Sequence, residues 1–185
     1  MAESYDLYFY AGQGIDAHAA GRALAQSVSA GRPAQAPTSA SLSPGRLAQL
    51  AGDVAAAVPE TEQAPAEEAP PGSQLLQWPE FPHGQLELHR SHARFGIRGT
   101  SVRGGSVLAN WHARLVGAAP LLTQAGFDTI YDAELDRVIS LPEDWPEVNL
   151  NWWTFYCGPP TPPRPPERSV DCSGRRIHRR SFRCP

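Results

Sequence analysis

The chain has 185 residues, including 19 prolines and 16 glycines, a length typical of one domain with tails. Its net charge of −3 hides an asymmetry: residues 1–156 hold 17 acidic residues and 9 arginines, whereas residues 157–185 hold 2 and 7. No stretch approaches the ~20 apolar residues of a membrane helix, no signal peptide is visible and residues 1–156 contain no cysteine, so we expect a cytoplasmic protein without a membrane segment or a disulfide framework.

The N-terminal part of the chain predicts one strand followed by two helices. Residues 5–10, YDLYFY, are aromatic-rich and are typical of a strand. Asp16 is a suitable N-cap for a helix that follows directly. A second helix is predicted to begin after Ser43, a suitable N-cap, with Pro44 at its first helical position. Pro59 ends this helix.

The next segment, residues 60–73, has the sequence ETEQAPAEEAPPGS and holds no apolar side chain larger than alanine or proline. It cannot bury enough apolar surface to offset the entropy lost on ordering, so we predict a disordered acidic loop. Beyond it, residues 75–78 form a short strand or the approach to one, and residues 85–89 and 94–98 are predicted strands joined by a turn near Ser91.

The clearest pattern lies between residues 106 and 139. Apolar residues recur every three or four positions from Leu108 to Leu122, which predicts one face of a helix. Ser106 is a suitable N-cap and Gly126 a suitable residue just past the C-terminus. This helix leads directly into a strand, a connection typical of α+β domains.

Pro120 lies inside this helical pattern and removes one backbone hydrogen bond, so we expect a kink or a split there. The alternation over residues 127–132 predicts a strand, and residues 137–141 predict a short strand that pairs back onto it. Residues 142–156 contain three tryptophans and are expected to pack on the body as irregular structure. If they form an exposed patch instead, that patch is a partner-binding site. Its candidate residues are Trp145, Trp152, Trp153 and Tyr156.

The order of these elements, β-α-α-β-β-α-β, indicates one α+β domain over residues 1–156. The order resembles the split β-α-β arrangement of the ferredoxin-like superfold, with helices on one face of the sheet and one extra helix. A disordered basic tail of prolines and arginines, residues 157–185, is expected to follow.

Short motifs at both ends of this domain are similar to those of small uncharacterised proteins from high-GC bacteria. The sequence SYDL at residues 4–7 begins the first strand, and a glycine, a strand and a YD turn at residues 126–132 end the domain. The resemblance covers roughly residues 4–140. Some members of that set look like toxin-immunity or other partner-binding proteins, so the resemblance implies protein binding and no established chemistry.

Two glycine-rich stretches imitate nucleotide-binding motifs but lack a required part. Residues 12–17 fit G-x-G-x-x-A between a strand and a helix, yet no second strand ending in an acid follows about 20 residues on. Residues 99–106 fit the phosphate-binding loop of nucleotide hydrolases, except that Gly105 replaces the lysine. We therefore expect no cofactor, no catalytic residue and no enzymatic activity.

A smaller role remains for the loop before the helix at residue 106. Arg98, Arg103 and the helix N-terminus at Ser106 could hold an anion. Either His89 or His92 could join them in a small-molecule enzyme or sensor. The odd spacing of these two histidines would place them on opposite faces of a strand, unless the turn between them reorients them.

Two groups of possible metal ligands lack the spacing of a known site, and we predict no metal. Three cysteines and a histidine in the tail could form a Cys₃His zinc site, but their spacings of 15, 6 and 6 positions contain no C-x₂-C pair. The acidic residues near the last strand lack the residue order of a calcium loop. The candidates are Cys157, Cys172, His178 and Cys184 in the tail, and Asp128, Asp132, Glu134 and Asp136 near the strand.

The tail itself has two further interpretations. Clustered arginines with an aromatic residue suggest binding to nucleic acid or another acidic partner. These residues are Arg175, Arg176, Arg179, Arg180 and Phe182. The abrupt loss of hydrophobic periodicity at residue 157 is also typical of a GC-rich message read out of frame, so an extension without function is the alternative.

The sequence thus supports three functional hypotheses. The first is a non-enzymatic protein-binding module of an immunity-type or regulatory kind. The second is nucleic-acid or acidic-partner binding through the arginine-rich tail. The third is a small-molecule or anion-binding enzyme or sensor at the loop from Arg98 to Ser106.

Overall fold

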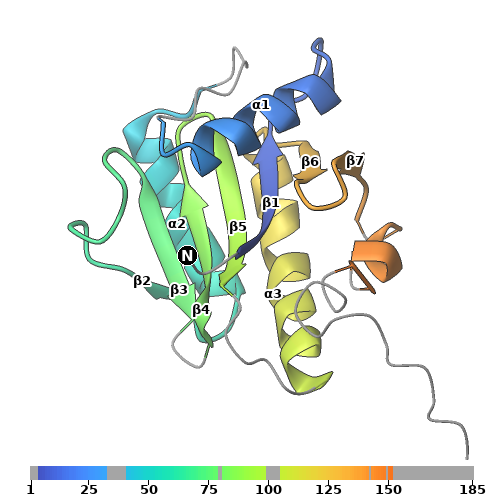
Figure 1. Ribbon diagram of the computed structural model, residues 1–185. Helices are drawn as coiled ribbons and strands as arrows, with labels where there is room; N and C mark the ends of the chain where they lie inside the picture. The colour runs from blue at the N-terminus through green and yellow to red at the C-terminus, as the bar shows by residue number, and fades with distance from the viewer. Residues whose placement is uncertain are drawn as a thin grey trace, which may run out of the picture.

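The computed structural model describes residues 4–32, 41–78, 81–98, 105–141, 143–148 and 150–151, which form a seven-stranded antiparallel sheet, three helices and a short helical stretch near the end of the described chain (Figure 1). The strands are β1 (Ser4–Tyr10), β2 (Glu62–Gln63), β3 (Gln74–Trp78), β4 (Phe81–Leu88), β5 (His92–Arg98), β6 (Thr129–Asp132) and β7 (Arg137–Ile139). The helices are α1 (Ala17–Ser29), α2 (Pro44–Ala57) and α3 (Gly105–Gln124). The strand order across the sheet is β2-β3-β4-β5-β1-β6-β7.

The predicted α+β class is confirmed, and local sequence signals account for the helix starts. Asp16 caps α1 by accepting a hydrogen bond from the Ala19 amide at 3.0 Å. Ser43 caps α2 by accepting one from the Arg46 amide at 3.3 Å, with Pro44 at the first position. None of the helices in the described parts of the chain has the length and hydrophobicity that a membrane span requires.

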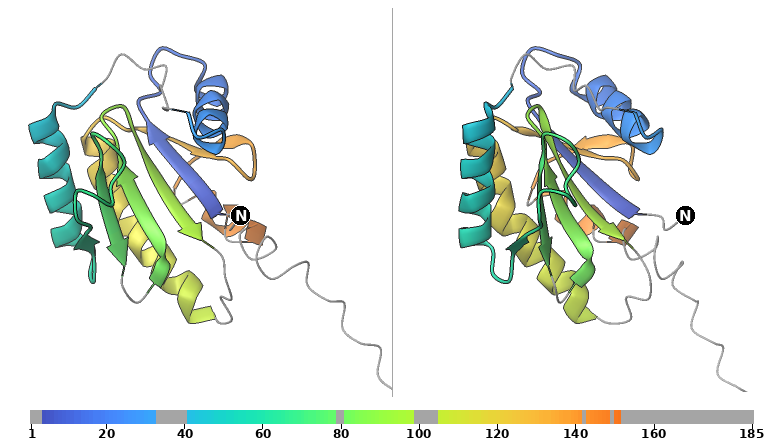
Figure 2. Two further views of the ribbon diagram at one scale, coloured as in Figure 1. Left: turned by 60° about the vertical axis from the view of Figure 1, so that its left-hand side comes forward. Right: turned by 90° about the vertical axis from the view of Figure 1, so that its left-hand side faces the viewer.

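Successive side chains of β1 point to opposite faces of the sheet, and each face has its own apolar core. Tyr5, Leu7 and Phe9 face a large apolar core formed with α2 and α3. Tyr8 and Tyr10 face a smaller core on the opposite side, formed with α1. Figure 2 shows α2 and α3 together behind one face of the sheet and α1 alone on the other. Central strand β1 is therefore buried on both faces.

α1 covers only one end of its face of the sheet, where it contacts β1, β6 and β7. Gly21 lets the helix approach closely, since a Cβ there would lie 2.4 Å from the Tyr131 ring. Arg22 fixes the same end by donating from Nε to the Asp136 carboxylate at 3.0 Å. The main contacts of α1 are with β1, β6 and β7, and its contacts with β3, β4 and β5 are at most slight.

Residues 60–73 differ from the disordered loop that their composition predicts, because the structure describes all of them and pairs Glu62–Gln63 with β3. The Thr61 hydroxyl explains part of this order. It donates to the Val58 carbonyl at 2.7 Å and accepts a hydrogen bond from the Trp78 indole at 2.8 Å. The body thus supplies anchoring contacts that the composition of the segment does not reveal.

Two further expectations can be compared with the structure. Of the kink or split expected at Pro120, the split is wrong, because α3 runs through this residue as one helix. Val116, whose carbonyl loses its usual donor, is 45% exposed, and water can take that donor's place. The segment expected to be irregular is helical at residues 145–148 and 150–151, where the fully buried Val148 attaches it to the large core.

Candidate functional site

A row of charged and polar side chains crosses the sheet from β1 to β2, on the face opposite α2 and α3. Directly opposed residues of antiparallel strands share a face, so the strand register places this row on the same side as Tyr8. We call it the polar stripe. It consists of Asp6 on β1, Arg94 on β5, Gln85 and Glu87 on β4, Gln77 on β3 and Glu62 on β2.

Arg94 joins the central residues of the polar stripe. Its guanidinium donates from Nη2 to Asp6 Oδ2 and from Nη1 to Glu87 Oε1, both at 3.0 Å. The three side chains are only 12–14% exposed. Burial opposes the charge, but Asp6 and then Glu87 outweigh it and raise the pKa of Arg94. Two carboxylates against one guanidinium give the network a formal net charge of one negative.

Gly96 makes room for this network. It lies opposite Asp6 in the register, and a Cβ there would be 2.7 Å from Asp6 Oδ1. A side chain at this position would push the carboxylate away from Arg94. Glycine inside a strand is unfavourable by roughly 0.5–1 kcal/mol relative to alanine, so its presence here reflects the close approach of Asp6.

His89 and His92 lie together at the hairpin end of β4 and β5, with ring centroids 4.3 Å apart and planes at 12°. The turn does reorient them: the His89 amide donates to the His92 carbonyl at 2.8 Å, so the two residues oppose each other and share a face. Burial, and secondarily His89, lowers the pKa of His92 to about 3. His89 Nε2 lies 3.6 Å from Glu87 Oε2, which connects the pair to the polar stripe.

The predicted anion site lies outside what the structure describes. Arg103 is not described, and the side chains of Arg98 and Ser106 are not either. The backbone of β5 nevertheless corrects one part of the hypothesis. His92 and Arg98 occupy opposite ends of this strand, about 20 Å apart at roughly 3.3 Å per residue. The two histidines therefore do not border the loop that follows Arg98.

Of the four aromatic candidates for partner binding, the structure describes Trp145; Trp152, Trp153 and Tyr156 lie outside the described residues. Trp145 is partly buried against the large core. Its ring centroid lies 4.3 Å from that of His112 on α3. In this position Trp145 packs the helical turn at residues 145–148 onto the body.

The tail candidates for zinc binding lie outside the described residues; they are Cys157, Cys172, His178 and Cys184. Within the described ranges, no three possible metal ligands gather in one place. The acidic residues near β6 are separated. Asp132 is fully buried and accepts the Tyr5 hydroxyl at 2.6 Å, and burial raises its pKa. Asp136, at the following turn, binds Arg22 and Tyr131.

The loop between β1 and α1, which imitates a dinucleotide motif, is a closely packed turn. The Gly12 amide donates to Asp128 Oδ1 at 2.9 Å, and this bond is the main reason that the pKa of Asp128 is lowered. Asp16 accepts the Ala19 amide at the start of the helix. The backbone N–H groups that would donate to a bound phosphate therefore already donate to carboxylates of the protein. A Cβ at Gly12 would lie 1.9 Å from Thr129 Oγ1.

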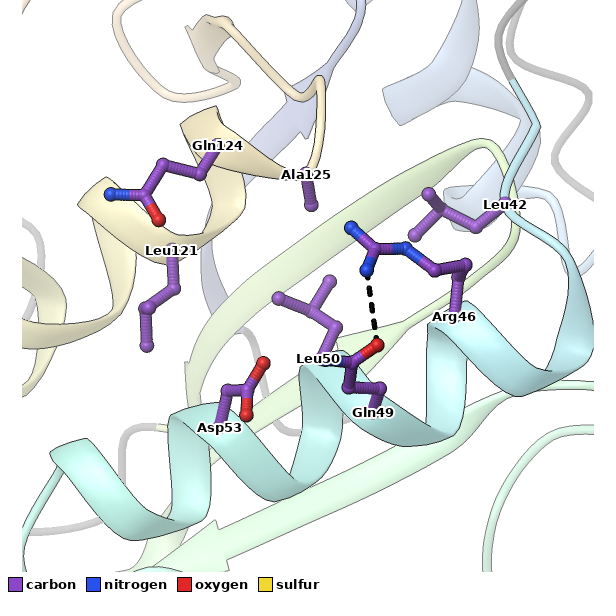
Figure 3. Close-up of a pocket in the computed structure, with 8 residues that line it drawn as sticks. All are labelled: Leu42, Arg46, Gln49, Leu50, Asp53, Leu121, Gln124 and Ala125. Carbon is purple, nitrogen blue, oxygen red and sulfur yellow. Dashed lines mark hydrogen bonds between the residues drawn. The ribbon is translucent and has the colours of Figure 1, made fainter.

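A small hollow lies between α2 and α3, on the far side of the sheet from the polar stripe (Figure 3). Leu50 and Leu121 form part of its apolar surface, and Arg46 donates to Gln49 Oε1 at 3.0 Å along its edge. The cavity volume is about 70 Å³. That space suits one side chain or about two water molecules, against roughly 300–1,000 Å³ for small-molecule sites.

Sequence reasoning assigned no site role to Asp6, Glu87 or Arg94. A hairpin signal could have linked two of them. A two-residue turn at residues 90–91 opposes His89 to His92, and the same register opposes Glu87 to Arg94. No comparable signal links Asp6 to them, because 88 positions separate it from Arg94.

No family model, curated protein or solved structure matches this chain. The resemblance to the high-GC bacterial proteins therefore stays a prediction from short motifs.

Proposed function

We propose that this chain is a non-enzymatic protein-binding module, immunity-type or regulatory, whose contact surface is the polar stripe. The observation that carries the proposal is the Asp6–Arg94–Glu87 network, held across the central strands β1, β5 and β4 on the face of the sheet opposite α2 and α3. Charged groups fixed in this way lose little conformational entropy on binding a partner.

An exposed sheet face alone would not support this proposal, since antiparallel sheets commonly have one solvated face. The support comes from how this face is built. Ion pairs that are mostly withdrawn from water gain little net stability, and Gly96 weakens its strand further. Uncharged polar side chains would keep this face hydrated without the cost of withdrawing charges from water or of placing a glycine in the strand. A fixed arrangement of charges that adds little stability is expected at a binding surface, because complementary charge determines which partner binds.

We also propose that β4, β5, β1 and β6, with α2 and α3 on one face, correspond to the split β-α-β unit of the ferredoxin-like superfold. The strand order supports this, since β1 lies between β5 and β6 and is antiparallel to both. In this scheme α1 is the extra helix, and the remaining strands are additions. The fold supports many functions and adds no argument for any one of them.

The test is co-purification of the full chain from native extract, with Gln77→Arg compared against Gln124→Arg. Gln77 lies in the polar stripe and Gln124 lies beside the hollow on the opposite side, so the two variants make the same chemical change on opposite surfaces. We expect Gln77→Arg to reduce a stoichiometric partner roughly tenfold and Gln124→Arg to leave it unchanged. Equal recovery with both variants would exclude the polar stripe as the contact surface.

Nucleic-acid binding through the tail is the second candidate, favoured by its seven arginines against two acidic residues. It predicts an affinity that falls steeply with salt, because basic side chains displace counterions from phosphates. Nuclease treatment during the same co-purification separates the two candidates. A partner lost on nuclease treatment indicates the tail, whereas one that survives it and is lost with Gln77→Arg indicates the polar stripe.

A further inference from the structure

We propose that α1 is a displaceable cover, which opens as a unit while the sheet, α2 and α3 stay folded. Opening would uncover three tyrosines that continue the polar stripe and would enlarge the surface offered to a partner. The role of that surface rests on the proposed function, whereas the opening itself does not. Three structural features support this: the small contact that holds α1, the side chains beneath it and the glycines at its ends.

The apolar contact of α1 is small compared with that of α2. The buried residues of α1 are Ala20, Gly21 and Leu24, so Leu24 is its one large buried side chain. α2 buries Ala51 together with three large side chains, those of Leu47, Leu50 and Val54. Because hydrophobic stabilisation scales with the apolar area removed from water, α1 is held less firmly than α2. Regions with few buried apolar contacts open at a lower free energy than the whole domain.

The polar contacts between α1 and the turn after β6 are open to water. Arg22 and Asp136 form an ion pair in which each side chain is 49% exposed. His18 Nε2 lies 2.8 Å from the Asp136 carbonyl oxygen, and the His18 side chain is 44% exposed. Ion pairs with this exposure contribute little to stability, because water and salt screen them. These contacts therefore align α1 on the turn without preventing its opening. Opening would also break the bond from the Tyr10 hydroxyl to the Ala17 carbonyl.

Three tyrosines pack against α1 and are at most 2% exposed: Tyr8, Tyr10 and Tyr131. In the strand register Tyr131 opposes Tyr8, and Tyr8 opposes Arg94, so this row continues the polar stripe across β1 and β6. Tyrosine and arginine are among the residue types that contribute most to protein–protein binding. Displacement of α1 would therefore present aromatic rings directly beside the Arg94 network.

Glycines on both sides of α1 allow the chain to change direction there. Gly14 and Gly31 have φ angles of 77° and 63°, which glycine adopts without strain. No atom lies within 4 Å of the position that a Cβ would occupy at either residue. Just before Gly14, the Gly12 amide donates to Asp128 and fixes the chain at the end of β1. α1 can therefore swing about Gly14 while β1 keeps its place in the sheet.

Hydrogen exchange of the full chain in low concentrations of urea tests the opening. Leu24, Leu50 and Leu122 are matched probes, because each is a buried leucine within α1, α2 or α3. We expect the Leu24 amide to exchange at least about 100-fold faster than the other two, with a weaker dependence on urea, because opening of α1 exposes little surface. Equal rates and equal urea dependence at all three amides would overturn the proposal.

Gly21→Leu blocks the closed position of α1, and Gly52→Leu in α2 is the matched control. A Cβ at Gly21 would lie 2.7 Å from the Tyr131 Cβ, so rotation of the tyrosine ring cannot remove the clash. At Gly52 a Cβ would meet no atom within 4 Å. Leucine favours a helix more than glycine does, so neither variant weakens its helix directly. We expect Gly21→Leu to remove the protection of the Leu24 amide while α2 and α3 stay protected, and Gly52→Leu to leave Leu24 protected. Unfolding of the whole chain by Gly21→Leu, or a Leu24 amide that stays protected, would overturn the proposal.

Recovery of the partner in the co-purification separates this inference from the proposed function. Gly21→Leu should raise recovery several-fold, because the form that exposes the tyrosines is then no longer a minor population. Unchanged or reduced recovery would overturn the regulatory role of α1, while a loss of the partner with Gln77→Arg would still support the polar stripe. If the exchange data show that α1 opens but the partner ignores Gln77→Arg, the proposed function fails instead.

Discussion

The two faces of the sheet are built on different principles, and consecutive residues of β5 show the contrast. Phe95 is fully buried under α2 and α3, with its ring centroid 5.3 Å from that of Trp78. Arg94 points to the other side and binds two carboxylates. The apolar face depends on filled volume, which tolerates swaps of similar size. The polar face depends on directional bonds, which tolerate almost none.

The largest change in stability that we expect comes from removing a large side chain from the apolar core. Phe95→Ala removes a fully buried ring and should reduce the free energy of unfolding by about 3–5 kcal/mol, because the transfer free energy and a cavity term add. Urea denaturation measures this loss. Phe95→Leu is the control and should cost much less. A similar loss in both variants would show that ring contacts with Trp78, rather than volume, determine stability here.

The matched change on the polar face is Arg94→Met. It leaves Asp6 and Glu87 without their shared cation, and we expect a loss of about 2 kcal/mol, less than the ~3–5 kcal/mol of a fully buried pair. In a background with Asp6→Asn and Glu87→Gln, which has no carboxylate charge at these positions, the loss caused by Arg94→Met should shrink. Urea denaturation of the variants in both backgrounds measures it. An identical loss in both would assign the effect to packing of the arginine stem, not to charge.

Gly96→Ala tests whether the polar face needs its glycine. The added Cβ would meet Asp6 Oδ1 at 2.7 Å, and we expect a loss of about 1–3 kcal/mol from this overpacking. Gly52→Ala in α2 is the control, since its Cβ would meet no atom within 4 Å, and it should stabilise by about 0.5–1 kcal/mol. Thermal denaturation compares them. Adding Asp6→Ser to Gly96→Ala should recover part of the loss, and no recovery would contradict the proposed clash.

The smallest expected effect at neutral pH concerns His92. Burial lowers its pKa from 6.5 to about 3, so between these values the unfolded chain binds more protons. Stability therefore rises with pH in this window, by up to about 1.4 kcal/mol per unit, and is lost as the pH falls from 6.5 toward 3. His92→Gln should flatten this slope in denaturation experiments at several pH values. An unchanged slope would show that other groups cause it.

The sequence alone determined those features that depend on a few neighbouring residues. The caps at Asp16 and Ser43 set the starts of two helices, because one side chain and one amide close each bond. The alternation in residues 5–10 determined which side chains share a face, because successive residues of a strand point in opposite directions. The α+β class followed from the order of such elements.

Tertiary structure decided what depends on distant partners. Asp6 meets Arg94 only because β1 lies beside β5, and burial of Leu7 and Phe95 on the apolar face fixes that register. The same applies to residues 60–73, which Trp78 helps to anchor. Composition describes what a segment can bury by itself, whereas contacts between distant segments become visible only when packing brings them together.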